Sequence, residues 1–167
     1  NRILAPYDPS IDPTNQGINW QPHQAKIAIA SGGLTGTGLG EGTQSQSNAI
    51  PGKHTDFIFA VVGEELGLIG ACLVILLLMI IVIRCVQIGL RSGNTMSMLV
   101  CFGVASTVVF QTFENIGMCI GIAPVVGITL PFFSYGGSSL FSMFAAMGLV
   151  SGIKYRPKPT RAAIYGR

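Results

Sequence analysis

Asp56 stands at the point where a polar segment meets a long apolar one. It follows His54 and Thr55, and the apolar segment of about 57–83 begins directly after it. A carboxylate at the boundary of lipid and water is costly to keep, which points to a function. It can act as a general base that takes a proton from a substrate hydroxyl. It can also simply cap the first turn of a helix, as can Thr55.

Further polar side chains lie within the apolar segments. Glu64 follows Asp56 by eight residues, which on a continuous helix places it about 80° around and about 12 Å deeper. It can line the same cavity, or pair with a polar group on a neighbouring helix. Gln111 and Asn115 are four residues apart, and so share a helix face. Both hydrogen bonding between helices and a role in lining a substrate groove are open to them.

A run of small and hydroxyl-bearing residues opens the last apolar segment. Small residues allow helices to pack closely. The alternative is a broken helix start whose N–H groups face a phosphate. The run consists of Ser134, Tyr135, Gly136, Gly137, Ser138 and Ser139.

Several common sites are absent from the sequence pattern. The glycine cluster at 31–42 lacks the spacing of a phosphate-binding loop. His54 has no second metal-ligand candidate at close spacing, so we predict no metal ligand set. The cysteines are widely spaced, and are predicted to be small apolar fillers of helix contacts rather than disulfides or metal ligands. They are Cys72, Cys85, Cys101 and Cys119.

The composition is that of an integral membrane protein. Of 167 residues, 49% are hydrophobic and 10% are charged, whereas soluble domains carry about 25% charged residues. The net charge of +3 is small and scattered, which argues against nucleic acid as a partner. Because the chain starts with Asn1, we expect it to be the C-terminal part of a larger polytopic protein.

The predicted fold class is an all-α membrane protein. Residues 1–56 are polar and rich in turn formers, and are predicted to form an extracytoplasmic loop with short amphipathic segments. Residues 57–167 are predicted to hold three transmembrane helices and a basic tail. The predicted spans are about 57–83, 96–122 and 132–153.

Basic residues predict the orientation. Arg84 and Arg91 lie between the first two spans, and Lys154 opens the basic tail after the third. Positive charge gathers on the cytoplasmic side of membrane proteins. The C-terminus is therefore predicted to be cytoplasmic, with residues 1–56 outside.

Several segments of the chain together form a family signature. They are Pro51-x-x-His54-Thr55-Asp56, Gly63-Glu64-Glu65-Leu66-Gly67, Asn115-Ile116-Gly117-Met118 and the stretch from Pro124 to Ser139. In this order they resemble the shape, elongation, division and sporulation (SEDS) proteins, the RodA/FtsW/SpoVE family. The resemblance extends over nearly the whole chain.

This resemblance implies a fold and an activity. Members are ten-helix enzymes that polymerise lipid II into peptidoglycan glycan strands, for cell elongation or division, and release undecaprenyl diphosphate. The chain would supply the last large outer loop and the last three helices. The essential aspartate of the family falls on Asp56. The implied substrate-binding residues are Lys53, His54, Thr55, Glu64, Gln111, Asn115, Ser134, Tyr135, Gly136, Gly137, Ser138 and Ser139.

The resemblance also implies cofactors and partners. The leaving diphosphate calls for cations, either basic residues such as Lys53 or Lys26 or a divalent ion, Mg²⁺ or Mn²⁺. The expected partners are lipid II, the nascent glycan strand, a class B penicillin-binding protein and the bilayer of the bacterial cytoplasmic membrane. Two other functions remain open: a flippase of lipid-linked precursors, and a non-catalytic scaffold for a transpeptidase.

Overall fold

The computed structural model describes residues 17, 19–46 and 55–155, and these residues form helices and loops without any strand. The all-α class is therefore confirmed for the described part of the chain. The helices are α1 (Trp20–Gly32), α2 (Thr43–Gln46), α3 (Ile58–Glu65), α4 (Gly67–Arg91), α5 (Thr95–Ile120) and α6 (Gly137–Tyr155).

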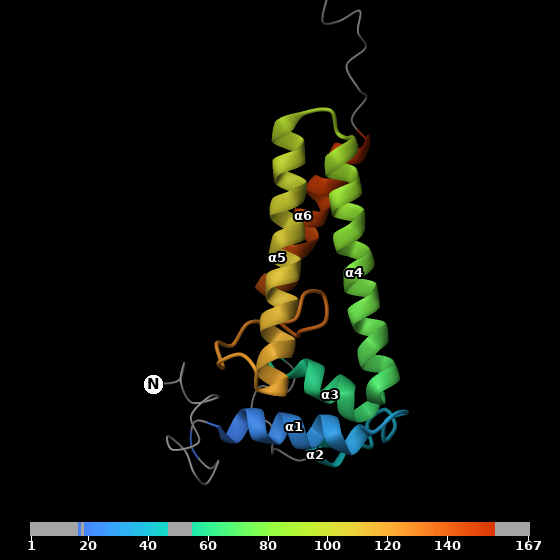
Figure 1. Cartoon of the computed structure of the whole chain (residues 1–167), viewed down its shortest axis with the longest axis vertical. Helices are drawn as coiled ribbons and strands as arrows, with labels where there is room; N and C mark the ends of the chain where they lie inside the picture. Colours follow the sequence, from blue (N-terminus) through green and yellow to red (C-terminus); the bar gives the residue numbers. More distant parts are fainter. Residues whose placement is uncertain (1–16, 18, 47–54, 156–167) are drawn as a thin grey trace, which may run out of the picture.

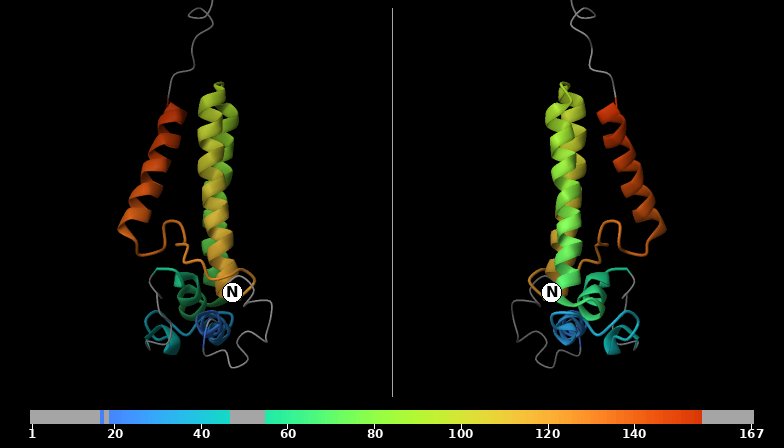
Figure 2. Two further views of the ribbon diagram at one scale, coloured as in Figure 1. Left: turned by 90° about the vertical axis from the view of Figure 1, so that its left-hand side faces the viewer. Right: turned by 90° about the vertical axis from the view of Figure 1, so that its right-hand side faces the viewer.

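The helices form two parts with different directions. Helices α4 and α5 are a long antiparallel pair, and α6 runs beside them at a tilt (Figures 1 and 2). Helices α1, α2 and α3 lie across one end of this bundle, with α1 roughly perpendicular to α4 and α5 (Figure 1). The α4–α5 turn and the end of α6 lie at the opposite end.

Helices α4 and α5 are long and apolar enough to cross a membrane. They contain 25 and 26 residues, or about 38 Å at about 1.5 Å per residue. A hydrocarbon core is about 30 Å thick. Leucine and isoleucine side chains on α4, including Leu73, Leu76 and Ile80, are about half exposed, as suits a lipid-facing or helix-facing surface. Helix α6 has 19 residues, and its role as a third span stays a prediction.

The predicted single helix over 57–83 is wrong, because it is broken near its start. Helix α3 ends at Glu65, and α4 begins at Gly67, where φ is +66°. A side chain at Gly67 would lie 2.6 Å from the carbonyl oxygen of Leu34, and closer still to the backbone nitrogen of Gly36. The glycine loop thus packs directly on the break, and only glycine fits there.

The other two predicted helices differ less from the structure. Helix α5 begins at Thr95, where the Asn94 side chain accepts a hydrogen bond from the Met96 N–H at 3.0 Å. It ends at Gly121, a left-handed residue with φ +75° that stops helices well. The third helix was expected from 132, but α6 begins at Gly137 because Phe132, with φ +65°, lies in a turn.

Close packing joins α1 to α3. Ala25, Ala28 and Gly32 are buried on one face of α1. A side chain at Gly32 would lie 2.8 Å from the carbonyl oxygen of Glu64. The two helices can therefore approach one another only because this face of α1 carries small residues.

Replacing Gly32 by alanine is expected to destabilise the protein. The added methyl group would overlap the backbone of α3, and overpacking of this kind costs about 1–3 kcal/mol. The control is Gly103→Ala, because a side chain at Gly103 meets no atom within 4 Å. Thermal unfolding of the two purified variants should show a lowered midpoint for Gly32→Ala alone. Equal midpoints would contradict the packing of α1 on α3.

Candidate functional site

Asp56 lies in a turn that precedes α3. The N-cap of α3 is Phe57, so Asp56 is outside the helix rather than in its first turn. The first turn of α3 contains no acidic residue, and its N-cap, Phe57, has no side chain that can cap. Asp56 is partly exposed, whereas Phe57 is buried in the core beneath it. The capping role considered for Asp56 is therefore not what the structure shows.

Two buried side chains hold the backbone of this turn. The Asn115 amide nitrogen donates to the carbonyl oxygen of Asp56 at 2.8 Å, and to that of Ile128 at 2.7 Å. The Ser134 hydroxyl donates to the carbonyl oxygen of Thr55 at 2.6 Å. The same hydroxyl accepts the N–H of Leu130 at 2.7 Å. Consecutive carbonyls of the turn are thus tied to α5 and to the loop before α6, an arrangement that we call the carbonyl clamp.

The loop between α5 and α6 faces the Asp56 carboxylate. Gly127 has φ +76°, and a side chain there would lie 3.3 Å from Asp56 Oδ2. Because residue 127 is glycine, no side chain from this position crowds the carboxylate. Gly127 was part of the recognised sequence pattern but was not predicted as a site residue. Its signal is a glycine within a proline-bracketed loop.

Glu64 is fully buried, and its oxygens are occupied within the protein. The backbone N–H groups of Gln44 and Ser45 donate to Oε1 and Oε2, each at 2.8 Å. The Thr43 hydroxyl is 3.5 Å from Oε1. The Glu64 backbone carbonyl also accepts from the N–H of Thr37, at 3.0 Å. Of the two roles considered, buried pairing fits these contacts, and the partners are residues 43–45 rather than another long helix.

Polar acceptors lie on successive turns of α5. Gln111 Oε1, Glu114 Oε2 and Asn115 Oδ1 are buried and have no hydrogen-bond partner among the described residues. A buried acceptor without a donor is costly, above all in a membrane. These atoms therefore mark a face of α5 that needs a donor from a substrate or from further polypeptide.

The residues from Ser134 to Ser139 do not share one exposed surface, because some are buried and others exposed. Ser134 is buried in the carbonyl clamp, and the Ser139 hydroxyl lies 2.9 Å from that of Thr129. Gly136 is partly buried. Tyr135, by contrast, is 82% exposed, and Gly137 and Ser138 are exposed at the start of α6. The exposed members remain predicted substrate contacts.

The described residues do not form a site for the implied divalent cation. No group of three His, Cys, Asp or Glu side chains that could hold a metal ion occurs among them. Lys26, one of the candidate counter-charges, instead lies against Gly121 at the C-terminus of α5. A cation there complements the helix dipole. Lys53 and His54 lie outside the described residues.

Comparison with known proteins agrees with the recognised pattern. Residues 1–158 match the family model of the FtsW/RodA/SpoVE cell cycle proteins. The chain is 43% identical, over 152 residues, to the peptidoglycan glycosyltransferase MrdB of Escherichia coli K12, covering 91% of this chain and 40% of that protein. It is 42% identical, over 159 residues, to the probable peptidoglycan glycosyltransferase FtsW of Geobacter metallireducens, covering 95% of this chain and 42% of that protein.

A solved structure shares the fold. It is a chain from work on the structural coordination of polymerization and crosslinking by a peptidoglycan synthase complex. The TM-score is 0.67 and the identity 31%, over 93% of this chain and 41% of that chain. The chain thus spans about two fifths of the length of these relatives.

Removing the Ser134 hydroxyl should loosen the Asp56 turn. In Ser134→Ala the Thr55 carbonyl and the Leu130 N–H lose a partner, at a cost of about 1–3 kcal/mol for each buried unsatisfied group. Hydrogen exchange measured by mass spectrometry should speed up in peptides that contain residues 55–60 and 130–134. Ser106→Ala, which removes an exposed hydroxyl from α5, is the control. Unchanged exchange in Ser134→Ala would refute the clamp.

Replacing Glu64 by glutamine should weaken the attachment of residues 37–46 to α3. One carboxylate oxygen becomes an NH₂ group, which faces a backbone N–H and cannot accept its hydrogen bond. We expect faster proteolysis of the segment 37–46 in the folded protein. Glu65→Gln is the matched control, because Glu65 accepts one hydrogen bond from the Ser45 hydroxyl, at 3.1 Å. Equal cleavage of the two variants would show that Glu64 does not hold this loop.

Proposed function

The chain belongs to the FtsW/RodA/SpoVE family of cell cycle proteins, and from this membership we propose that it carries the catalytic end of a peptidoglycan glycosyltransferase. The relatives in E. coli and Geobacter bear that name or its probable form. The proposed substrates are lipid II and the nascent glycan strand, and the proposed process is cell-wall synthesis in elongation or division.

The observation that carries the proposal is the placement of the Asp56 carboxylate. It lies in the turn before α3, beside Asn115 near the end of α5. At this end, α1–α3 lie across a bundle whose helices α4 and α5 are of membrane length (Figure 1). Its backbone is held by the carbonyl clamp, and Gly127 leaves space beside it. A lipid-linked sugar brings its apolar chain and its polar head to the same kind of boundary.

In the proposed reaction, Asp56 acts as general base or orients the acceptor. Its carboxylate takes the proton of a sugar hydroxyl on lipid II as that oxygen attacks the anomeric carbon of the donor strand. The new glycosidic bond forms while the bond from the anomeric carbon to the diphosphate breaks. Undecaprenyl diphosphate leaves with the electron pair, and the proton remains on Asp56 until it passes to water.

The carbonyl clamp contributes by positioning. General base catalysis needs the base within hydrogen-bond reach of the proton, and an error of about 1 Å is costly. Asn115 and Ser134 touch the backbone of the turn rather than the reacting atoms, so they are positioning residues in this proposal.

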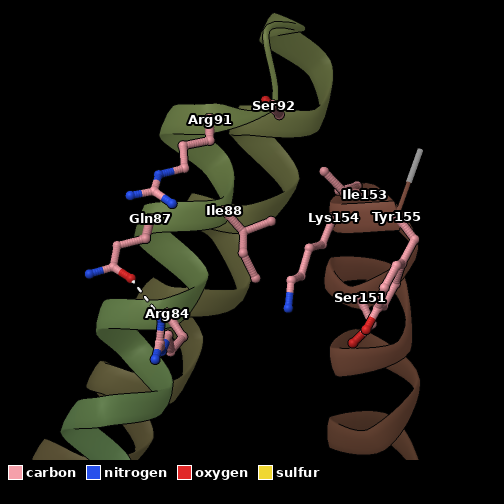
Figure 3. A pocket seen from close by; sticks show the side chains of 9 residues that line it. All are labelled: Arg84, Gln87, Ile88, Arg91, Ser92, Ser151, Ile153, Lys154 and Tyr155. Atoms are coloured by element: carbon pink, nitrogen blue, oxygen red, sulfur yellow. Dashed lines mark hydrogen bonds between the residues drawn. The ribbon is translucent and has the colours of Figure 1, made fainter. Parts of the chain in front are cut away.

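The proposed location is the bacterial cytoplasmic membrane, with Asp56 on the outer face. Arg84, Arg91 and Lys154 gather at the end of the bundle away from Asp56 (Figures 1 and 3). Because basic residues favour the cytoplasmic side, this end and the C-terminus would be cytoplasmic. A class B penicillin-binding protein is the proposed partner. The similar synthase complex, whose description joins polymerization to crosslinking, supports it.

Asp56→Asn in the complete protein is expected to abolish polymerisation of lipid II. Asparagine keeps the size of the side chain but cannot take up the proton, and general base catalysis contributes about 10²–10⁴-fold to rate. Glycan products from purified protein and lipid II should fall by about 100-fold or more, while lipid II binding is retained. Glu41→Gln, which removes an exposed acid from the outer loop, is the control.

Three other results would contradict the proposed role of Asp56 or indicate a different function. Normal polymerisation by Asp56→Asn would refute the role of its carboxylate. A wild-type protein that forms no glycan, but moves lipid II across vesicle membranes, would be a flippase. A wild-type protein that does neither but binds the transpeptidase would be a scaffold.

A further inference from the structure

A polar cavity lies at the end of the bundle opposite Asp56. It has a volume of about 600 Å³ and opens between α4 and α6 (Figure 3). Polar side chains that line it are Arg84, Gln87, Arg91, Ser151, Lys154 and Tyr155. The function proposed above makes no use of it.

The cavity is cationic. Three of its lining residues, Arg84, Arg91 and Lys154, carry a positive charge, and none of the described residues that line it is acidic. In Figure 3 Lys154 points from α6 into the space towards α4, whereas Arg91 extends from α4 on the side away from α6. Arg84 donates a long hydrogen bond, of 3.4 Å, to Gln87 Oε1. Since guanidinium carries five donors, most remain available to an anion.

The depth of Arg84 indicates where the anion comes from. It lies two helical turns before Arg91, or about 10 Å further into the bundle. Its neighbours Ile80 and Ile83 are about half exposed, so the surface around it is apolar. At such a depth, an arginine side chain extends towards the membrane interface or binds the phosphate of a lipid headgroup.

An apolar groove adjoins the cavity. It has a volume of about 310 Å³, lies between the start of α5 and the end of α6, and shares Ile153 with the cavity. Met96, Val100 and Leu149 line it together with Gly148 and Gly152, which leave room. A slot of this shape beside a cationic cavity suits an acyl chain attached to a phosphate head.

We propose that this cavity and groove bind an anionic phospholipid, with its headgroup phosphate beside Lys154 between α4 and α6, near Arg84 and Arg91 of the lining, and an acyl chain along Ile153. The basic residues that continue after Tyr155 in the sequence would add attraction to an anionic leaflet. Basic pockets between membrane helices on the cytoplasmic side are suited to such headgroups. The inference rests on the membrane placement of α4 and α5, and it does not depend on the reaction at Asp56.

Native mass spectrometry of the complete protein in detergent tests the proposal. The protein is titrated with phosphatidylglycerol, or with phosphatidylcholine as the neutral comparison. We expect R84Q/R91Q/K154Q to weaken phosphatidylglycerol binding by about 100-fold, given what a cation contributes near an anionic surface. K158Q/R161Q/R167Q removes the same charge from the tail, and should weaken it by only a few-fold. The single variant Lys154→Gln, which should still lower affinity measurably, serves if the triple variant fails to fold.

Three results would overturn the proposal. Undiminished phosphatidylglycerol binding by the folded cavity variants is the first, and it is also the result expected if further polypeptide fills the cavity. Equal binding of phosphatidylcholine is the second. Displacement of the lipid by millimolar inorganic phosphate is the third, because it would make this a site for soluble phosphate. Asp56→Asn should bind phosphatidylglycerol normally, which separates failure here from failure of the proposed reaction.

Discussion

The position of Asp56 depends on hydrogen-bond donors for the backbone carbonyls of Thr55 and Asp56. The turn precedes α3 and packs its next residue, Phe57, into the core. Backbone acceptors buried near a membrane need donors. Asn115 and Ser134 supply them from two different segments. The position of the carboxylate is therefore decided by three parts of the chain that are distant in sequence.

Near the other end of α3, the buried Glu64 side chain also needs hydrogen-bond donors. A buried carboxylate in apolar surroundings requires donors, and the loop after the glycine cluster provides backbone N–H groups. The glycine cluster itself, at Leu34 and Gly36, packs on Gly67, where α4 begins. The short helix α3 is thus held at its start by the carbonyl clamp and at its end by the hydrogen bonds of Glu64. It connects the segment of residues 33–46 to the long helices.

Some of these features can be predicted from the sequence and others cannot, for physical reasons. Helices α4 and α5 follow from apolar length alone, and the predicted span of about 96–122 lies close to α5, Thr95–Ile120. The break at Gly67 was missed because the run stays apolar through it, and the contact that demands a left-handed glycine comes from a loop some thirty residues earlier. Asn115 and Ser134 were singled out by their polarity. Their partners are backbone carbonyls, which no residue type reveals.

The two ends of the bundle carry opposite chemistry, and this links the proposed orientation to the proposed sites. Asp56 and the loop layer occupy one end, and Arg84, Arg91 and Lys154 occupy the other (Figure 1). Helices of about 38 Å separate them, so one choice of direction in the membrane places both at once. If the cations face the cytoplasm, the carboxylate must face outward, where a lipid-linked sugar can reach it without crossing the bilayer. An anionic lipid held at the cationic end would then stabilise the same direction that the reaction requires.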